Sequence, residues 1–309
     1  MQVFLSTLSQ TTALFLLIAI GFLLGRLRVL PDNSAATLAK LENNVFVPCL
    51  ILGTFMEHFT VERLSFFASS ILVSCAITAV VVPVAIFAAR LLTKDAYERN
   101  IFTYGLVFSN FGFMGNAIVN AIYPDLFLDY LIFTLPLWFL IYLWGVPSLL
   151  IADASRKQTW QDRMRALINP MFIAMLVGML IGLLKIPMPD PAISVISTAG
   201  SCMSPIAMLL TGITVSKINF RETFTSLRIY LVSAVRLLVM PLLFLLFALF
   251  IPFDPVVRVV AVASLAMPLG LNTIVIPSAY GRDVRVASGM AIISHLLSLL
   301  TIPLVFALV

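Results

Sequence analysis

Long apolar runs separated by short charged connectors form the main pattern along the chain. The runs lie near residues 1–25, 36–56, 64–89, 101–123, 130–151, 167–184, 192–216, 227–250, 256–280 and 286–308. Each comes close to the ~20 residues that a helix needs to cross ~30 Å of hydrocarbon. The second run is the weakest, because Lys40 and Glu42 must lie near the interface. The pattern predicts an all-α polytopic membrane protein with ten transmembrane helices.

Composition supports this class and excludes others. The 309 residues are 61% hydrophobic and 11% charged, more apolar surface than a soluble domain can bury. Continuous apolar runs favour a helical bundle over a β-barrel, whose strands alternate apolar and polar. Residues 1–25 have no basic start, which predicts a first spanning helix and not a signal peptide.

The charged residues, cysteines and histidines give no sign of a nucleic-acid partner or a metal site. The net charge of +5 comes from basic residues between the apolar runs, which indicates membrane topology and no nucleic-acid partner. Cys49, Cys75 and Cys202 lie in apolar runs without metal-ligand spacing, and His58 and His295 are the only histidines. We expect no metal and no cofactor. The chain also has no GxSxG, HExxH or P-loop pattern, so we expect no enzyme.

The distribution of lysine and arginine predicts the orientation. If the N-terminus is outside, the inner connectors hold fifteen of the 19 basic residues and the outer ones hold Arg63, Lys185 and Arg258. The fifteen are Arg26, Arg28, Lys40, Arg90, Lys94, Arg99, Arg156, Lys157, Arg163, Arg165, Lys217, Arg221, Arg228, Arg282 and Arg285. The positive-inside rule therefore places both termini outside the cytoplasm and the basic connector 153–166 inside.

The two halves of the chain repeat each other at an offset near 157 residues. The matched pairs are Gly21 with Gly178, Gly25 with Gly182, Pro31 with Pro187, Pro48 with Pro205, Pro83 with Pro241, and Pro147 with Pro303. Because five spans per half is an odd number, the second half enters from the opposite side. We predict an inverted 5+5 repeat: residues 1–152, the connector 153–166, and residues 167–309.

Two polar, glycine-containing stretches interrupt the apolar spans four and nine. In the first, residues 109–120 hold three asparagines and two glycines, which are costly in lipid unless the helix breaks and lines a cavity. A broken helix offers free N–H groups and a positive dipole end that suit a carboxylate. The candidate binding residues are Asn110, Gly112, Gly115, Asn116 and Ala117 in span four, and Pro268, Gly270, Asn272 and Thr273 in span nine.

The bland alternative is that these amides bond neighbouring helices as structural glue. Asn116-Ala-Ile-Val and Asn272-Thr-Ile-Val recur 156 residues apart, and this recurrence favours a site. Pro48 and Pro205 would kink spans two and seven near it, although packing alone explains prolines in membrane helices.

Ionisable residues inside the spans leave several readings open. Arg236 could pair with an anionic substrate, hold a carbonyl-rich helix end, or snorkel to the inner interface. His295 could titrate in a proton role or be a satisfied structural histidine. Glu42 could be an interfacial helix charge or part of a gate, and we favour the interfacial reading. No Asp or Glu sits at the middle of a span, which weakens a case for carboxylate-based coupling to protons or sodium.

Several of these motifs resemble the auxin efflux carrier family, which groups bacterial organic-acid permeases with plant auxin exporters. They are Gly21-Phe-Leu-Leu-Gly25 with the Pro31 turn, Asn44-Val-Phe-Val-Pro48, Ser109-Asn110-Phe-Gly-Phe-Met-Gly115, Pro268-Leu-Gly270, Tyr280-Gly-Arg-Asp283, Ala287-Ser-Gly289 and Leu299-Leu-Thr-Ile-Pro303. The resemblance implies a scaffold domain from spans 1, 2, 6 and 7, and a transport domain from spans 3–5 and 8–10. It also implies crossing breaks beside the substrate, elevator-like alternating access and a homodimer. The plant exporters carry a proline at each crossover, where this chain has Ala117 and Thr273.

These observations predict a secondary transporter for a small organic anion in the bilayer of a plasma (inner) membrane. The coupling ion, H⁺ or Na⁺, stays open. One alternative is a sodium-coupled symporter resembling bile-acid transporters, and another is a non-transporting membrane sensor on the same fold.

Overall fold

The computed structural model describes residues 2–151, 159–216 and 226–309. All regular structure in these ranges is helical, apart from one isolated β-bridge between Ser109 and Leu269. Several helices are long and apolar enough to cross a membrane. The predicted class, an all-α polytopic membrane protein, is confirmed. Arg156, Lys157, Lys217 and Arg221, which entered the orientation argument, lie outside the described residues.

The first half of the chain forms the helices of predicted spans one to five. They are α1 (Gln2–Arg26), α2 (Ser34–Leu41), η1 (Glu42–Phe46), α3 (Val47–His58), η2 (Val61–Arg63), α4 (Leu64–Leu92), α5 (Ala96–Val107), η3 (Phe111–Gly115), α6 (Asn116–Ile122), η4 (Pro124–Leu126), α7 (Phe127–Leu140) and η5 (Ile141–Leu150).

The second half forms those of spans six to ten. They are α8 (Trp160–Leu167), α9 (Pro170–Leu184), α10 (Asp190–Ser201), α11 (Met203–Ser216), α13 (Leu227–Ala234), η6 (Val235–Val239), α14 (Met240–Phe247), α15 (Pro255–Ala266), α16 (Asn272–Ala279) and α17 (Arg285–Phe306).

The long helices match the predicted spans, and the two exceptions are the predicted broken ones. Seven continuous helices pass the length and hydropathy requirements for a span among the described residues, and the bent pair α8–α9 makes an eighth. Spans four and nine are each two short helices around a break: α5 with η3–α6, and α15 with α16. The count of ten crossings stays a prediction.

The outer faces of the helices are apolar. The Val61–Leu92 segment has a mean hydropathy of 2.7 over its best window, yet only 17% of that window is buried. Leu72, Phe87 and Leu91 on α4 are each more than 60% exposed. Exposed apolar surface on this scale is stable only against lipid, so these faces mark the contact with the bilayer.

The matched glycines hold equivalent places in the two halves. A Cβ on Gly21 would meet the backbone of Leu209, and one on Gly25 would meet Ser216, so α1 lies directly against α11. A Cβ on Gly182 would lie 2.7 Å from the carbonyl oxygen of Phe55, so α9 lies equally close to α3. In both pairs the helices run parallel. Small residues permit this approach in membrane helices.

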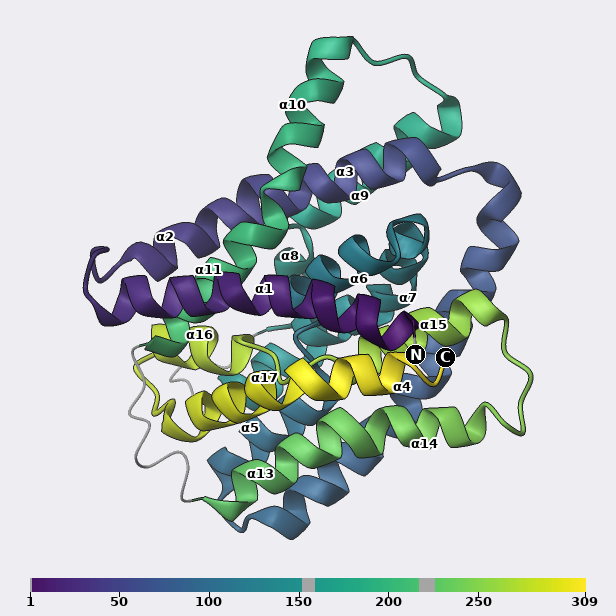
Figure 1. The fold of residues 1–309 in the computed structure, drawn as a ribbon. Coiled ribbons are helices and arrows are strands. Elements are labelled where there is room, and N and C mark those ends of the chain that lie inside the picture. Colours follow the sequence, from purple (N-terminus) through teal and green to yellow (C-terminus); the bar gives the residue numbers. More distant parts are fainter. Residues whose placement is uncertain (1, 152–158, 217–225) are drawn as a thin grey trace.

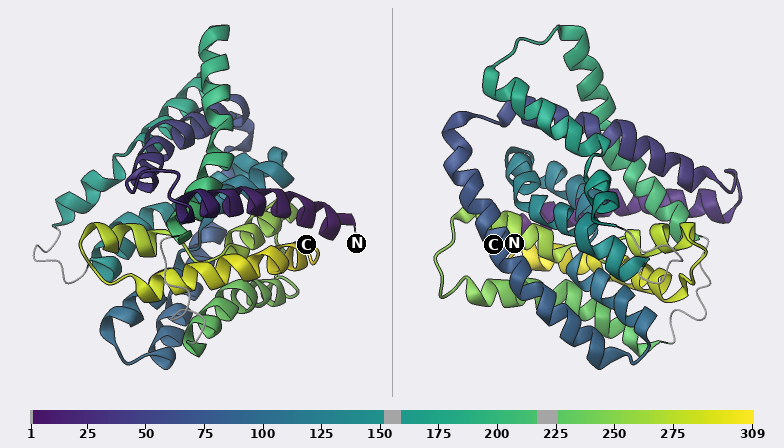
Figure 2. Two further views of the ribbon diagram at one scale, coloured as in Figure 1. Left: turned by 60° about the vertical axis from the view of Figure 1, so that its left-hand side comes forward. Right: turned by 180° about the vertical axis from the view of Figure 1, so that it is seen from behind.

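The helices form two groups around these contacts. Figure 1 shows α1, α2, α3, α9, α10 and α11 together in its upper part, and α4, α5, α13, α14, α15 and α17 below them. The views in Figure 2 keep this separation. The helices α6 and α7 lie between these groups, and α1 packs against both α11 and α17. The division into a scaffold and a transport domain, and relative motion between them, stay predictions.

The two ends of the chain lie close together at one end of the molecule, where α1 begins and α17 ends (Figures 1 and 2). This arrangement agrees with both termini being on one side of the membrane. Which side that is stays a prediction.

The second span differs from its expectation. It is a continuous helix from Ser34 to His58, with the π-helical turn η1 in its middle. Glu42 opens that turn, is fully buried, and has no hydrogen-bond partner for either carboxylate oxygen among the described residues. This burial does not fit a solvent-exposed charge, whereas the depth of Glu42 in the membrane stays a prediction. Hydropathy alone could not place it, because burial here depends on how α9, α10 and α11 pack around η1.

Candidate functional site

The two broken spans meet at their breaks. After α5 ends, Phe108 has extended backbone angles, and Ser109 pairs with Leu269 in an antiparallel bridge. The backbone N–H of Asn110 donates to the carbonyl oxygen of Pro268 at 2.7 Å. The predicted crossing of spans four and nine is thus present as a direct backbone contact.

Gly270 permits this contact. A Cβ at Gly270 would lie 3.0 Å from the carbonyl oxygen of Phe108 and 3.2 Å from that of Ser109. Backbone oxygens move aside less easily than the end of a flexible side chain. The close approach of the two segments therefore favours glycine at position 270.

The breaks lie a few residues before the positions suggested by the plant exporters. The interruptions span residues 108–110 and 267–271, whereas Ala117 lies inside α6 and Thr273 inside α16. The predicted breaks are present, and the structure gives the break points that the sequence left open. In span four the second half-helix starts with the π-helical turn η3 at Phe111.

A small cavity with polar and apolar walls lies beside the crossing. Four predicted site residues line it: Asn110, Gly112, Gly270 and Asn272. The other lining residues are Tyr104, Ser109, Phe111, Phe113, Trp138, Ile141 and Leu271. Its volume is about 20 Å³, which is room for about one water molecule.

The two cavity asparagines are held by different partners. The Nδ2 atom of Asn110 lies 3.1 Å from Nε2 of His295, whose Nδ1 atom lies 2.7 Å from the carbonyl oxygen of Ala291. Nδ2 of Asn272 donates to the hydroxyl of Tyr104 at 3.2 Å. All of these groups except Asn272 are buried. Both amides are therefore partly bonded to protein and also face the cavity.

Both half-helices begin at the cavity. η3 starts at Phe111 and α16 at Asn272. At the start of α16 the N–H groups of Thr273 and Ile274 already donate to the carbonyls of Gly270 and Leu271, at 3.2 and 2.9 Å. The positive ends of two helix dipoles therefore converge on the same small space. Such a space favours a negatively charged or strongly hydrogen-bond-accepting group.

The remaining candidate residues of the breaks lie behind the cavity. Gly115, Ala117 and Thr273 are buried in the half-helices, and Thr273 donates its hydroxyl to the carbonyl of Gly270 at 2.8 Å. Asn116 is 1% exposed, and its Nδ2 atom has no partner among the described residues. Pro268 supplies the carbonyl that accepts from Asn110.

Arg236 holds together the C-terminal ends of α5 and α15, the helices that precede the two breaks. Its guanidinium is 1% exposed and donates to the carbonyl oxygens of Leu106 at 2.9 Å, Ser264 at 2.9 Å and Met267 at 3.2 Å. These carbonyls belong to the C-terminal ends of α5 and α15, where a cation is favourable. Arg236 thus holds carbonyl-rich helix ends and does not snorkel.

Comparison with known proteins identifies the family of this chain. A family model described as a membrane transport protein matches residues 7–306. The chain belongs to this family. It is the auxin efflux carrier family that the motifs resemble. A relative from Methanothermobacter thermautotrophicus, named an uncharacterized transporter, is 26% identical over 312 residues, which is 98% of each chain.

In this membrane transport protein the two matched prolines lie away from the cavity. Pro48 follows the π-helical turn η1 at the start of α3, and Pro205 follows the interruption between α10 and α11. Each sits next to an irregular turn in its span. Neither lines the crossing cavity, so their influence on the site is through the shape of α3 and α11.

The sequence reasoning missed the aromatic wall of the cavity. Tyr104 and Trp138 face the asparagines and glycines, and Trp138 also lines a larger apolar pocket between α3, α7 and α9. Aromatic residues in apolar spans give no signal of their own, because most of them pack in cores. Gly112 is the position that makes room for this wall, since a Cβ there would lie 2.8 Å from the Trp138 ring.

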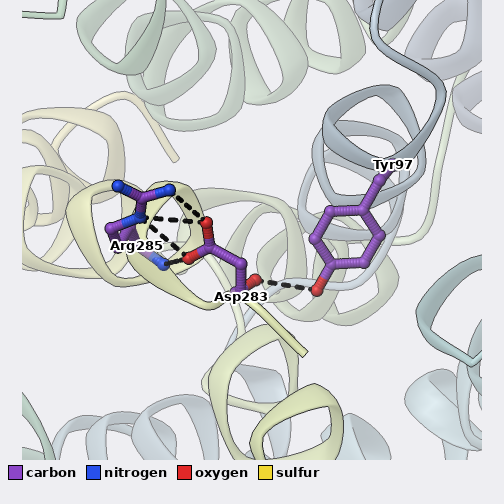
Figure 3. Close-up of polar contacts among 3 residues, drawn as sticks. All are labelled: Tyr97, Asp283 and Arg285. Carbon is purple, nitrogen blue, oxygen red and sulfur yellow. Dashed lines mark hydrogen bonds and ion pairs between the residues drawn. The ribbon is translucent and has the colours of Figure 1, made fainter. Parts of the chain in front are cut away.

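A polar cluster outside the predicted spans ties the two halves together at the face expected to be cytoplasmic. The Tyr97 hydroxyl donates to the carbonyl of Asp283 at 2.9 Å, and the Asp283 carboxylate pairs with Arg285 at 2.7 Å (Figure 3). Hydrogen bonds from Arg285 lower the pKa of Asp283, and burial raises the pKa of Tyr97. The cluster fastens the loop before α17 to the start of α5.

Proposed function

We propose that this protein is a secondary active transporter that moves a small organic anion, such as a carboxylate, across the membrane. The observation that carries the proposal is the direct crossing of the two broken spans, with two half-helix N-termini and two asparagine amides around one cavity. We place the protein in the plasma (inner) membrane with both termini outside, acting as a homodimer with elevator-like alternating access.

The chemistry of the cavity supports an anion. A carboxylate needs hydrogen-bond donors, and the N–H groups at the start of η3, together with the positive dipole ends of both half-helices, would provide a favourable environment without a fixed positive charge. Arg236, the buried cation nearest to the crossing contacts, is already committed to three carbonyls and does not line the cavity. Binding by dipoles and amides is compatible with release, because no buried ion pair has to be broken.

The first test is thermal stabilisation of the purified protein by a panel of organic acids. A ligand that binds only the folded state stabilises it by mass action and so raises the melting temperature. At a ligand concentration of one hundred times its Kd, the free energy of unfolding rises by about 2.7 kcal/mol. The panel contains dicarboxylates such as malate and malonate and aromatic weak acids, each with and without sodium. Stabilisation that requires sodium would indicate a sodium-coupled symporter. Binding without uptake into proteoliposomes would indicate a sensor.

Variants of the cavity asparagines connect binding to the site. We expect Asn272→Ala to abolish stabilisation and uptake, because it removes the amide that lines the cavity and bonds to Tyr104. Asn116→Ala tests whether the unpartnered amide behind the cavity also acts on substrate. Asn44→Ala is the matched control, since its Nδ2 donates to the Lys40 carbonyl at 2.7 Å on an exposed part of the span. Wild-type uptake by the Asn272 variant would refute the site.

A further inference from the structure

The contacts of His295 determine which edge of the Asn110 amide faces the cavity. The Ala291 carbonyl can only accept, so the Nδ1 atom of His295 that lies 2.7 Å from it must carry the hydrogen. A neutral imidazole with hydrogen on Nδ1 has an acceptor at Nε2. The Asn110 atom 3.1 Å from Nε2 must then be the Nδ2 donor.

This arrangement presents an oxygen to the site. With Nδ2 committed to His295, the Oδ1 atom of Asn110 has no donor among the described residues, and Asn110 lines the cavity. An amide oxygen repels a carboxylate, whereas the positive dipole ends of the two half-helices attract it. With His295 neutral, the cavity therefore contains one group of the wrong polarity for an anion.

We propose that His295 and Asn110 form a proton-linked switch that couples anion binding to the uptake of one proton. A proton from solution binds to Nε2 of His295, which then donates from both ring nitrogens. Nδ1–H keeps its bond to Ala291, and Nε2–H requires an acceptor, so the Asn110 amide turns over and offers Oδ1 to the ring. The Nδ2 hydrogens then face the cavity and bind the carboxylate. His295 is a positioning residue, because it acts on the substrate through Asn110.

The inference rests on the proposed function for its substrate, but the switch itself is a property of two side chains, His295 and Asn110.

The last helix, α17, is bonded to the crossing beside His295. The hydroxyl of Ser294 accepts from the backbone N–H of Leu269 at 3.2 Å. A rotation of the Asn110 amide is a local movement beside a space with room for about one water molecule, so the fold need not change for the switch to act.

No charged side chain among the described residues bonds to His295, so the proton on Nε2 has no fixed counter-charge. The elements packed against α17 are α1, α5, α11, α13, α15, α16 and η6. Their charged and titratable groups are Arg26, Tyr97, Glu98, Arg99, Tyr104, Arg228, Tyr230, Arg236 and Arg258. Arg236 is committed to three carbonyls, and Tyr104 bonds to Asn272 across the cavity. A bound anion would thus supply the missing counter-charge, which makes the two binding events cooperative.

Histidine nitrogen NMR tests the switch without any substrate. The chain has only two histidines, so His58→Gln leaves His295 as a single ¹⁵N-labelled probe. We expect the neutral Nδ1–H tautomer at pH 7.5. In the double variant with Asn110→Asp, an acidic group replaces the amide at Nε2, and we expect His295 to become an imidazolium at the same pH. An Nε2–H tautomer in the first protein, or an unchanged spectrum in the second, would overturn the proposal.

Proton movement in proteoliposomes tests the coupling. With malonate as the probe and a pH-sensitive dye outside, uptake by the wild type and by His58→Gln should make the medium more alkaline. The KM for malonate should rise about tenfold per pH unit where free His295 is neutral, as expected for one linked proton. His295→Gln can still bond to Asn110 but cannot take up a proton, so its KM should change less than about twofold from pH 6 to 8.

The two proposals fail in different ways. If no acid of the panel binds or is carried, the anion-transporter proposal fails and the NMR result alone decides the switch. If malonate is carried by the wild type without proton movement, or if His295→Gln keeps the tenfold pH dependence, the switch is refuted and the transporter stands.

Discussion

Replacing Arg236 should weaken the whole crossing, although this residue does not line the cavity. Its three hydrogen bonds hold the C-terminal carbonyls of α5 and α15 side by side. In Arg236→Met, the apolar chain keeps much of the volume but leaves Leu106, Ser264 and Met267 without this donor. The C-terminal ends of α5 and α15 would then lie side by side, with no cation to balance their negative dipole ends.

The expected loss of stability in Arg236→Met is the cost of the unpaired carbonyls minus the cost of burying the guanidinium charge. The Ser264 carbonyl keeps a second donor, the Ser109 hydroxyl at 2.9 Å, so two carbonyls are left without a donor. Each costs about 1–3 kcal/mol, which gives about 2–6 kcal/mol for the two. Removing the guanidinium also relieves the cost of burying a charge, which is several kcal/mol. We expect a net loss of about 1–3 kcal/mol. In a chain of this size, that corresponds to a melting temperature lower by about 2–6 °C.

Thermal melting of the detergent-purified variants measures this loss. Arg236→Lys keeps the charge but has no planar fork to reach three carbonyls, so we expect an intermediate melting temperature. Arg228→Met is the matched control, because its ion pair with Glu98 at 3.3 Å is 57% exposed on the arginine side. We expect a change below about 1 kcal/mol there. If Arg236→Met melts with the wild type, or no lower than Arg228→Met, the three bonds do not hold the crossing.

Two further predictions concern the crossing backbone and the orientation. Gly270→Val should abolish uptake while leaving expression and membrane insertion intact, because its Cβ would press on the Phe108 carbonyl. Gly281→Ala, which has a positive φ of 67° but nothing within 4 Å of the added Cβ, should cost only about 1 kcal/mol and leave uptake unchanged. Cysteines placed singly in the connector 153–166 should react in whole cells with membrane-permeant thiol reagents only. Labelling by an impermeant reagent would reverse the predicted topology.

The sequence predicted the fold class and the two breaks because both depend on composition and local pattern. Apolar runs of spanning length leave few alternatives to a helical bundle in lipid. Glycines and amides inside such runs indicate broken helices, and the breaks at Asn110 and Gly270 are where the chains cross. The repeated glycine pairs were also informative, since each pair permits the same close helix contact.

The partners of buried polar groups could not be predicted in the same way. The pairing of Asn110 with His295 joins residues 185 positions apart, and that of Arg236 with Leu106 joins residues 130 apart. Such contacts depend on the rotation of each helix about its axis, which apolar periodicity leaves open when a helix is apolar on all sides. Burial of Asp129, whose ion pair with Arg63 is 2.6 Å long, likewise follows from packing and not from local pattern.

The sequence repeat also suggested a symmetry that the cavity does not have. Asn116 and Asn272 recur 156 residues apart, but only Asn272 lines the cavity. Because η3 adds a π-helical turn after the first break, Asn116 begins α6 behind the cavity while Asn272 begins α16 on its wall. The place opposite Asn272 belongs instead to Asn110, the residue bonded to His295. The two halves therefore offer the cavity unlike groups: one amide held by a tyrosine hydroxyl, and one held by a ring that can gain a proton.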